Sequence, residues 1–241
     1  MIVEKTKLSD LLFIDIETVP AFESYDLLDD EWKSLWDYKA SFLARNGESS
    51  EELYARAGIY AEFGKVVCVS CGFFHEEDKA IQFRIKTFFG ENEHQLLSSL
   101  ANMLKKHFNK PAHKLVAHNG KEFDFPYLAR RLLISGVNLP NILNLGGKKP
   151  WEIQHIDTLE LWKFGDYKHY TSLRLLAKVF DLPSPKDDID GSQVAHVFYI
   201  EKNLPRLVQY CENDVLTLAN LYLRMNGKPI IEASAIVKNG K

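Results

Sequence analysis

The order of strand-like and helix-like segments along the chain is the feature that most constrains its fold. Residues 10–19, 65–75 and 79–90 carry the β-branched and aromatic residues typical of strands. An amphipathic helix pattern follows at residues 92–108, and a short apolar strand pattern comes next at residues 114–119. A helix that joins two strands implies a crossover connection and some parallel pairing. The sequence therefore predicts an α/β fold.

The second half of the chain predicts further helices and one further strand. Helix patterns cover residues 123–136, 171–182 and 203–225. Residues 152–164 are a strand candidate. Together with the earlier segments, these patterns predict a mixed sheet of five strands flanked by helices.

A long connection separates the first two strand patterns. Residues 21–63 span roughly forty residues, and a plain loop of that length is uncommon. Because helix-like segments recur inside it, we expect a small helical subdomain over one end of the sheet. We assign residues 1–228 to a single domain with this insertion, and we expect residues 229–241 to form a loosely held tail.

Composition and charge exclude some classes of protein. The formal net charge is −3 for 241 residues, which argues against a protein that coats nucleic acid through overall basicity. A local basic groove beside an acidic site is compatible with that charge. No apolar run approaches the roughly 20 residues of a membrane span, so we expect no contact with a membrane.

The cysteines indicate a reducing compartment. Three cysteines, an odd number, do not make a disulfide framework in a chain of this size, and we expect a cytoplasmic protein. Cys68 and Cys71 are three apart on a predicted strand and should point to opposite faces. This geometry argues against a shared zinc ion or a redox pair.

Two carboxylates stand one residue apart inside the first strand pattern. Asp15 and Glu17 lie in the segment LLFIDIETV, where ionised groups are costly to bury unless a positive charge meets them. Residues two apart on a strand face the same side, so the two carboxylates project together. Such a pair is a hard oxygen site suited to Mg²⁺ or Mn²⁺. On this segment alone, a strand-end cap or a solvated edge is an open alternative.

Two further segments place acids beside helices. Asn119 ends a strand pattern and Asp124 lies near the start of the next helix, at a kind of turn where α/β proteins bind ligands. Tyr210 and Asp214 are four residues apart and share one face of the last helix. Taken singly, Asp124 could complement the helix dipole, and Tyr210 with Asp214 could form a core hydrogen bond.

Together and in this order, the three segments resemble the 3′-5′ exonucleases that use four acids and a tyrosine. FIDIET, HNGKEFDFPYLARR and YCENDVLTL are each similar to motifs of the proofreading domain of family B DNA polymerases, and the likeness runs over residues 11–225. The chain also looks like the stand-alone bacterial PolB-like exonucleases. Gln209 stands where a related subgroup has a histidine base, so the chain resembles the tyrosine type, called DEDDy.

The resemblance implies a fold and a role for each motif residue. It implies a ribonuclease H-like mixed five-stranded sheet flanked by helices, with the helical insertion as a departure from the minimal proofreading core. It assigns the binding of two divalent ions, Mg²⁺ or Mn²⁺, to four carboxylates: Asp15, Glu17, Asp124 and Asp214. It assigns the orientation of the attacking water to Tyr210, since a phenol with a pKa near 10 is a poor free base. It assigns contacts with the terminal nucleotides to Thr18, Asn119 and Phe123.

The implied activity is hydrolysis of single-stranded DNA from its 3′ end by a two-metal-ion mechanism. RNA is the nearest alternative substrate, because discrimination depends on how a site treats the 2′-hydroxyl. A catalytically silent module that binds nucleic acid or a protein is a further hypothesis, although all four acids and the tyrosine are present. A separate polymerase or repair protein is a further expected partner, with the insertion as its docking surface.

Aromatic residues also interleave with lysines and arginines after the second motif. This mixture suits a groove that stacks single-stranded bases. The aromatic residues in question are Trp151, Trp162, Tyr167 and Tyr170.

Overall fold

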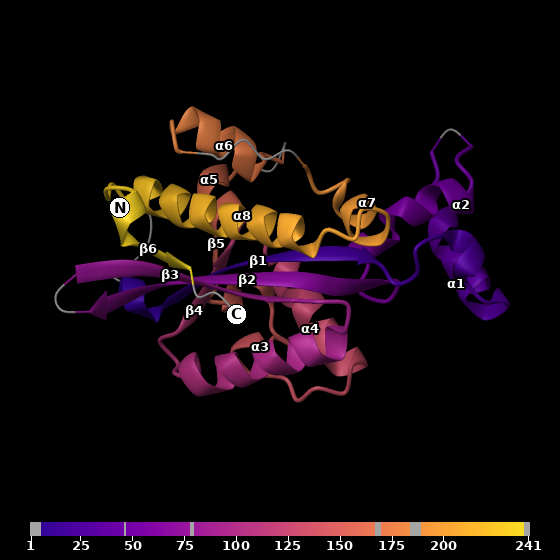
Figure 1. Cartoon of the computed structure of the whole chain (residues 1–241), viewed down its shortest axis with the longest axis horizontal. Helices are drawn as coiled ribbons and strands as arrows, with labels where there is room; N and C mark the ends of the chain where they lie inside the picture. Colours follow the sequence, from indigo (N-terminus) through magenta and orange to yellow (C-terminus); the bar gives the residue numbers. More distant parts are fainter. Residues whose placement is uncertain (1–5, 46, 78–79, 167–169, 184–188, 239–241) are drawn as a thin grey trace.

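The computed structural model describes residues 6–45, 47–77, 80–166, 170–183 and 189–238. A six-stranded sheet lies between two layers of helices, and the insertion projects beyond one end of the sheet (Figure 1). The order of the strands across the sheet is β5-β4-β1-β2-β3-β6. Their bounds are β1 (Leu11–Pro20), β2 (Gly64–Glu77), β3 (Ala80–Phe89), β4 (Lys114–Ala117), β5 (Ile156–Asp157) and β6 (Ile236–Lys238).

The sheet is mixed. β1 pairs antiparallel with β2 and parallel with β4, while β3 pairs antiparallel with β2. β5 and β6 extend the sheet in parallel to β4 and β3 respectively. The predicted α/β class and mixed sheet are confirmed, whereas the predicted number of five strands is wrong because the sheet has six.

The sixth strand comes from residues 229–241, for which the sequence predicts a loosely held tail. β6 pairs with Phe83–Ile85 of β3. The N–H of Ile231 donates to the side-chain oxygen of Asn220 at 2.9 Å, and Lys238 forms an ion pair with Glu212 at 2.6 Å. The described part of this segment is therefore attached to α8 and β3. A strand of three residues is too short to show a periodic pattern.

The segment 152–164 forms mainly a helix where the sequence predicts a strand. Only Ile156–Asp157 pairs with β4, and α5 (Thr158–Lys163) follows at once. The Asp157 carboxylate caps this helix by accepting a hydrogen bond from the Leu159 N–H at 2.9 Å. Short apolar runs fit a strand or a helix, so periodicity alone does not distinguish them.

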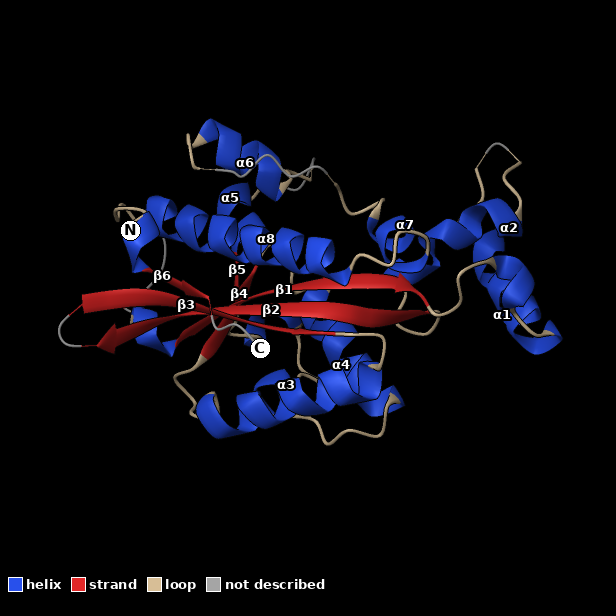
Figure 2. Ribbon diagram, in the orientation of Figure 1, coloured by secondary structure: helices blue, strands red, loops and turns tan. Residues whose placement is uncertain are grey.

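Helices cover both faces of the sheet (Figure 2). On one side lie α5, α6 (Leu173–Val179), α7 (Val194–Tyr199) and α8 (Leu204–Met225). On the other side lie α3 (Glu93–His107) and α4 (Asp124–Ile134). Short 3-10 helices span Leu8–Asp10, Tyr25–Leu27, Asn141–Leu143, Pro150–Glu152 and Ala233–Ala235. The four helices predicted from the sequence are confirmed as α3, α4, α6 and α8. The six-residue helix α7 is one that the sequence does not predict.

Alternate residues of β1 build the two cores. Phe13 packs edge-to-face on Tyr222 in the cluster beneath α8, with ring centroids 5.6 Å apart. Ile14 faces the other way and packs with Leu97 in the cluster beneath α3 and α4. The face that carries Phe13 also carries the acidic side chains further along the strand.

The insertion has a hydrophobic cluster of its own. The insertion contains α1 (Asp30–Ser41), α2 (Ser50–Leu53) and the 3-10 helix η3 (Tyr54–Ile59), so the predicted helical content is confirmed. The fully buried Trp36 ring lies edge-on to Tyr54 at 5.4 Å and to Phe63 at 5.1 Å. Its Nε1–H donates to the Ser50 carbonyl at 2.7 Å.

We expect Trp36→Ala to unfold the insertion selectively. Removing a buried tryptophan costs about 3–5 kcal/mol through lost burial and the cavity left behind, and here the Ser50 carbonyl also loses its donor. Hydrogen exchange should show rapid exchange in α1 and α2 while the sheet stays protected. The matched control is Leu35→Ala. The Leu35 side chain is 49% exposed, so this substitution should change the hydrogen exchange of the insertion little. Unchanged protection of α1 in the Trp36 variant would contradict the importance of this cluster.

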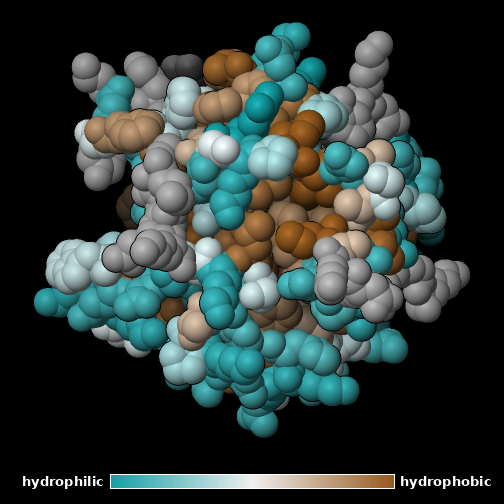
Figure 3. Space-filling view, turned by 90° about the vertical axis from the view of Figure 1, so that its left-hand side faces the viewer, coloured by the Kyte–Doolittle hydropathy of each residue, from teal (hydrophilic) through white to brown (hydrophobic). Residues whose placement is uncertain are grey.

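The end of the molecule remote from the insertion presents a hydrophobic surface. Figure 3 shows hydrophobic residues at the centre of this face and hydrophilic residues around them. None of the helices in the described ranges has both the length and the apolar character needed to cross a bilayer.

Candidate active site

The first acidic pair lies on the α8 side of β1, near the end of the strand. Asp15 is opposite Ser70 of β2 and Glu17 is opposite Cys68, and a bulge follows between Glu17 and Thr18. A bulge of this kind twists a strand and re-aims its side chains. Ile16, between the two acids, packs in the opposite core. The alternation predicted from the sequence is therefore observed.

α8 brings a second group of residues to the same place. The Cys211 thiol lies 3.4 Å from Oδ2 of Asp15, and one ligand atom from each of Asp15, Glu17 and Cys211 lies within 4.8 Å of the others. Asp214 is one helical turn beyond Tyr210, and the negative charge of Asp214 raises the pKa of Asp15. The last helix thus places its predicted acid beside the strand pair.

The close approach of α8 depends on a glycine in β2. A Cβ at Gly72 would lie 2.6 Å from Cγ1 of Val215 and 2.3 Å from Cζ of Phe83. Since real Cβ atoms essentially never come so near, a side chain here would force Phe83 of β3 and Val215 of α8 to shift. Gly72 therefore helps to keep Asp214, the residue before Val215, near β1.

Asp124 is the first residue of α4 and is buried, with 5% of its surface exposed. Burial raises the pKa of its carboxyl to about 7, and the charges of Asp157 and Asp214 add to the rise, although N–H groups of Asp124 and Ile16 partly offset it. The contact with the Ile16 backbone places Asp124 next to β1. Asp124 also raises the pKa of Asp15.

The Asp157 carboxylate helps to hold the turn before α4, together with backbone hydrogen bonds of the turn itself. Asn119 has a positive φ of 65°, and its N–H donates to Oδ1 of Asp157 at 2.9 Å. The Lys121 N–H donates to Oδ2 of Asp157 at 3.1 Å. The Asp157 carboxylate on β5 therefore shapes the loop that leads into α4.

A pocket of about 550 Å³ opens over the acids, which is the size of a typical small-molecule or cofactor site. Among the eight residues singled out from the sequence, the structure brings six to its lining: Asp15, Glu17, Thr18, Phe123, Tyr210 and Asp214. Asp124 and Asn119 do not line the pocket. Asp124 is nonetheless close enough for its charge to act on Asp15 and Glu17.

The electrostatics of the site favour a bound cation. Desolvation raises the pKa of Asp15 and of Glu17 well above the usual range, and the charges of neighbouring acids raise both further. Within the described ranges, no lysine or arginine forms an ion pair with Asp15, Glu17 or Asp124. Buried carboxylate oxygens without a cationic partner are the donors that a hard divalent ion prefers, so the residues present fit Mg²⁺ or Mn²⁺.

The cysteines occupy different positions around the site. Cys68 lies opposite Glu17 on the α8 side of β2, whereas Cys71 packs in the core beneath α3 and α4. The prediction that they point to opposite faces is therefore confirmed. Cys211, which no sequence pattern marks, forms with Asp15 and Glu17 a group of described residues that could hold a metal ion together.

Tyr170 is a pocket residue that sequence patterns place only in a general aromatic groove. It lines the pocket with Tyr210, and burial followed by the charges of Asp124 and Asp157 raises the pKa of its phenol. Trp162 instead packs on Phe180 at 5.8 Å, outside the pocket lining. Trp151 is also absent from the lining, and Tyr167 lies outside the described residues.

Residues of the insertion form another part of the pocket that the sequence did not predict. They are Ala55, Arg56, Gly58 and Ile59 of η3. The expectation of a subdomain over one end of the sheet is correct, but no local pattern marks these four residues as neighbours of the acids.

Comparison with known protein families identifies the chain. The family model described as "Predicted 3'-5' exonuclease related to the exonuclease domain of PolB" matches residues 59–229, more than half of the chain. The chain belongs to this family of 3′-5′ exonucleases. Asp124, Tyr210 and Asp214 lie within the matched residues of the exonuclease family, whereas Asp15 and Glu17 precede them.

Three solved structures are similar to this chain, and the similarity to a family B DNA polymerase has a TM-score above 0.5. The family B DNA polymerase from the hyperthermophilic archaeon Pyrobaculum calidifontis matches with a TM-score of 0.57 and 17% sequence identity, over 90% of this chain and 24% of the polymerase. The RNase domain of the yeast Pop2 protein matches with a TM-score of 0.44 and 11% identity, over 95% of this chain and 81% of that domain. E. coli Exonuclease I in complex with a dT13 oligonucleotide gives a TM-score of 0.39 and 11% identity, over 83% of this chain and 42% of Exonuclease I. The polymerase match shows that the exonuclease has the ribonuclease H-like fold and spans about a quarter of the polymerase's length.

Proposed function

We propose that the chain hydrolyses single-stranded DNA from its 3′ end with two divalent ions, Mg²⁺ or Mn²⁺. The observation that carries this proposal is the cluster of mutually repelling carboxylates beside an open pocket, in which Glu17 and Asp124 are buried and Asp15 is half-buried. Ionised carboxylates that are buried together are costly unless positive charge meets them. Bound cations would let these acids stay ionised near neutral pH.

The proposed ligands of the ions are Asp15, Glu17, Asp124 and Asp214. Asp15 is the proposed shared ligand, because the charges of Asp214 and Asp124 both act on it. When bound, two divalent ions would stabilise the attacking and leaving oxygens of phosphodiester hydrolysis.

The remaining motif residues position the reactants in this proposal. Tyr210 lines the pocket and would orient the attacking water through its hydroxyl. Phe123 lines the pocket while its ring also packs on Tyr127 at 5.3 Å, which supports an apolar contact with a terminal base. Thr18 would bind the terminal nucleotide from the strand end, and Asn119 is a proposed contact although it does not line the pocket.

DNA is the proposed substrate because the family is related to the exonuclease domain of a DNA polymerase. RNA is the alternative outcome of the test below. We also propose a cytoplasmic location, which the free, buried state of Cys68, Cys71 and Cys211 supports.

The proposal is tested with 5′-labelled single-stranded DNA and RNA oligonucleotides of one sequence. The protein should shorten DNA in Mg²⁺ or Mn²⁺, shorten RNA more slowly, and act on neither in a chelator. Asp214→Asn should reduce the rate by about 10³-fold through the loss of a ligand charge. Asp181→Asn, an identical change at an exposed residue outside the pocket, should cleave normally. Faster cleavage of RNA would reverse the substrate assignment, and cleavage that persists in the chelator would contradict metal dependence.

We expect Tyr210→Phe to lower kcat for DNA by about 10²-fold while KM changes little, because the lost hydroxyl positions water rather than the strand. Steady-state cleavage in Mg²⁺ measures both constants. Tyr38→Phe is the control, since Tyr38 is 70% exposed and lies in the insertion. An unchanged kcat in the Tyr210 variant would exclude the hydroxyl from the reaction.

A further inference from the structure

The insertion shares the pocket with the acids. Four of the residues that line it belong to η3, and Asp15, Glu17 and Asp214 line the same pocket. The insertion is therefore part of the wall of the candidate active site as well as a separate helical cluster.

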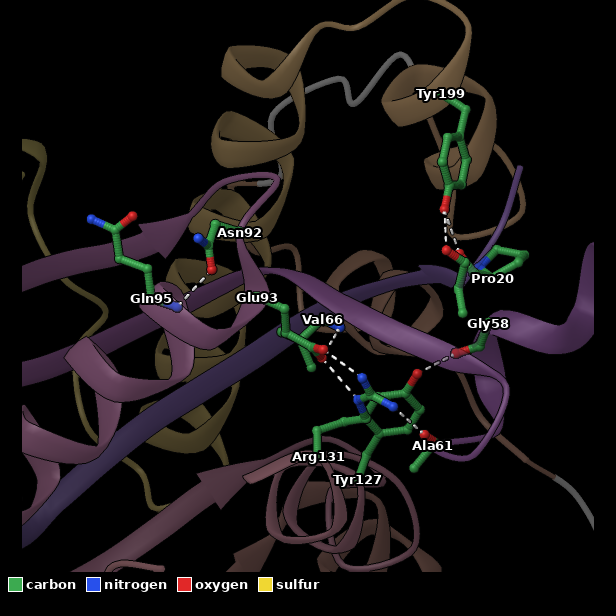
Figure 4. Close-up of polar contacts among 11 residues, drawn as sticks. Pro20, Gly58, Ala61, Val66, Asn92, Glu93, Gln95, Tyr127, Arg131 and Tyr199 are labelled. Atoms are coloured by element: carbon green, nitrogen blue, oxygen red, sulfur yellow. Dashed lines mark hydrogen bonds and ion pairs between the residues drawn. The ribbon is translucent and has the colours of Figure 1, made fainter. Parts of the chain in front are cut away.

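The end of η3 is packed directly on β1. A Cβ at Gly58 would lie 2.9 Å from the carbonyl carbon of Val19 and 3.0 Å from the nitrogen of Pro20, so only glycine permits this contact. The Tyr127 hydroxyl of α4 donates to the Gly58 carbonyl at 2.8 Å (Figure 4). The backbone of η3 is thus fixed relative to the strand that carries Asp15.

Both ends of the insertion are tied to helices of the core. The Tyr199 hydroxyl of α7 donates to the Pro20 carbonyl at 2.6 Å, where the insertion begins. Where it ends, Arg131 of α4 donates to the Ala61 carbonyl at 2.8 Å and forms two hydrogen bonds with Glu93 (Figure 4). These contacts hold η3 in place over the pocket.

Arg56 gives this wall a positive charge. Its side chain is exposed, lines the pocket and forms no ion pair with any residue in the described ranges. Among the described lining residues it is the single lysine or arginine, facing a pocket that otherwise carries acids. Ile59, 48% exposed, adds an apolar surface to the same wall.

A guanidinium binds a phosphate through paired charge-assisted hydrogen bonds, and such contacts fix the register of a nucleic-acid strand. The acids and their cations would engage the phosphate that is cleaved, so a cation elsewhere in the pocket suits a different phosphate. We propose that Arg56 binds a backbone phosphate of the substrate strand next to the scissile one, with Ile59 against a base or sugar. This inference rests on the proposed function, and it assigns strand binding to the insertion.

Binding of a fluorescent twelve-nucleotide single-stranded DNA, measured by anisotropy in Mg²⁺, tests this inference. The full chain carries Asp214→Asn to prevent cleavage. Adding Arg56→Gln should weaken binding about tenfold and reduce the slope of log affinity against log salt by about one. The affinity of the Arg56→Lys protein should lie between those of the parent and of Arg56→Gln. Lysine keeps the positive charge but lacks the planar guanidinium that forms paired hydrogen bonds with a phosphate. Arg45→Gln, an exposed arginine of the insertion outside the pocket, should stay within about twofold.

Affinity within twofold of the parent in the Arg56→Gln protein would overturn the inference, as would the absence of DNA binding by the parent. Failure of the proposed hydrolysis gives a different result. A wild-type protein that binds DNA through Arg56 but never shortens it would contradict the nuclease proposal and still support the binding role.

Discussion

Asp15→Asn is expected to reduce DNA hydrolysis by about 10³-fold or more and to stabilise the metal-free protein. Activity falls because the variant loses the proposed shared ligand of both ions. Stability rises because an amide removes a negative charge that desolvation, Asp214 and Asp124 all disfavour. Cleavage rates in Mg²⁺ and denaturant unfolding in a chelator measure the two effects on one preparation.

The combination of effects distinguishes a functional residue from a structural one. Asp181→Asn should change neither quantity, since Asp181 is exposed and lies outside the pocket. A destabilised but active Asp15 variant would contradict the account of this residue. Mg²⁺ should also raise the melting temperature of the wild-type protein and leave that of the Asp15 variant nearly unchanged.

The metal-free protein is expected to lose stability as pH rises from about 4 to about 7 because of Asp124, whose pKa is raised from 3.8 to about 7. The folded state holds the proton more tightly than the unfolded state, so this stabilising term is complete below the unfolded pKa. It is lost as pH rises through the folded pKa. Each unit of raised pKa corresponds to about 1.4 kcal/mol.

Denaturant unfolding in a chelator at several pH values between 4.5 and 8, compared with Asp124→Asn, isolates this term. The wild-type protein should become less stable relative to the variant as pH rises, and Mg²⁺ should reverse the difference near pH 8. Asp181→Asn provides the control for an exposed acid. A wild-type protein that gains stability over the variant with rising pH, in the absence of metal, would show that Asp124 has a cationic partner.

Local periodicity explains why much of the candidate site could be predicted. Asp15 and Glu17 share a face because β1 alternates, and Tyr210 and Asp214 share a face because α8 repeats every 3.6 residues. Each relationship extends over a few residues, so the sequence shows it directly.

The rest of the site depends on contacts between distant segments. Arg56 reaches the pocket because Gly58 packs on Val19, a contact that no local pattern marks. Cys211 meets Asp15 across 196 positions of sequence, where α8 packs on the sheet close to Gly72. β6 and the helix α5 were mispredicted for a different reason, since segments this short lack a distinctive period.

The central claim is that the acidic pocket removes nucleotides from a 3′ end. The most direct measurement compares one single-stranded DNA oligonucleotide labelled at its 5′ end with the same oligonucleotide labelled on its 3′-terminal nucleotide, both incubated with the protein and Mg²⁺. A 3′-5′ exonuclease should give a descending ladder from the 5′ label and release the 3′ label first as a mononucleotide. Both products should vanish in the Asp214→Asn variant. Immediate release of a mononucleotide from the 5′ label, or no shortening by the wild-type protein, would contradict the claim.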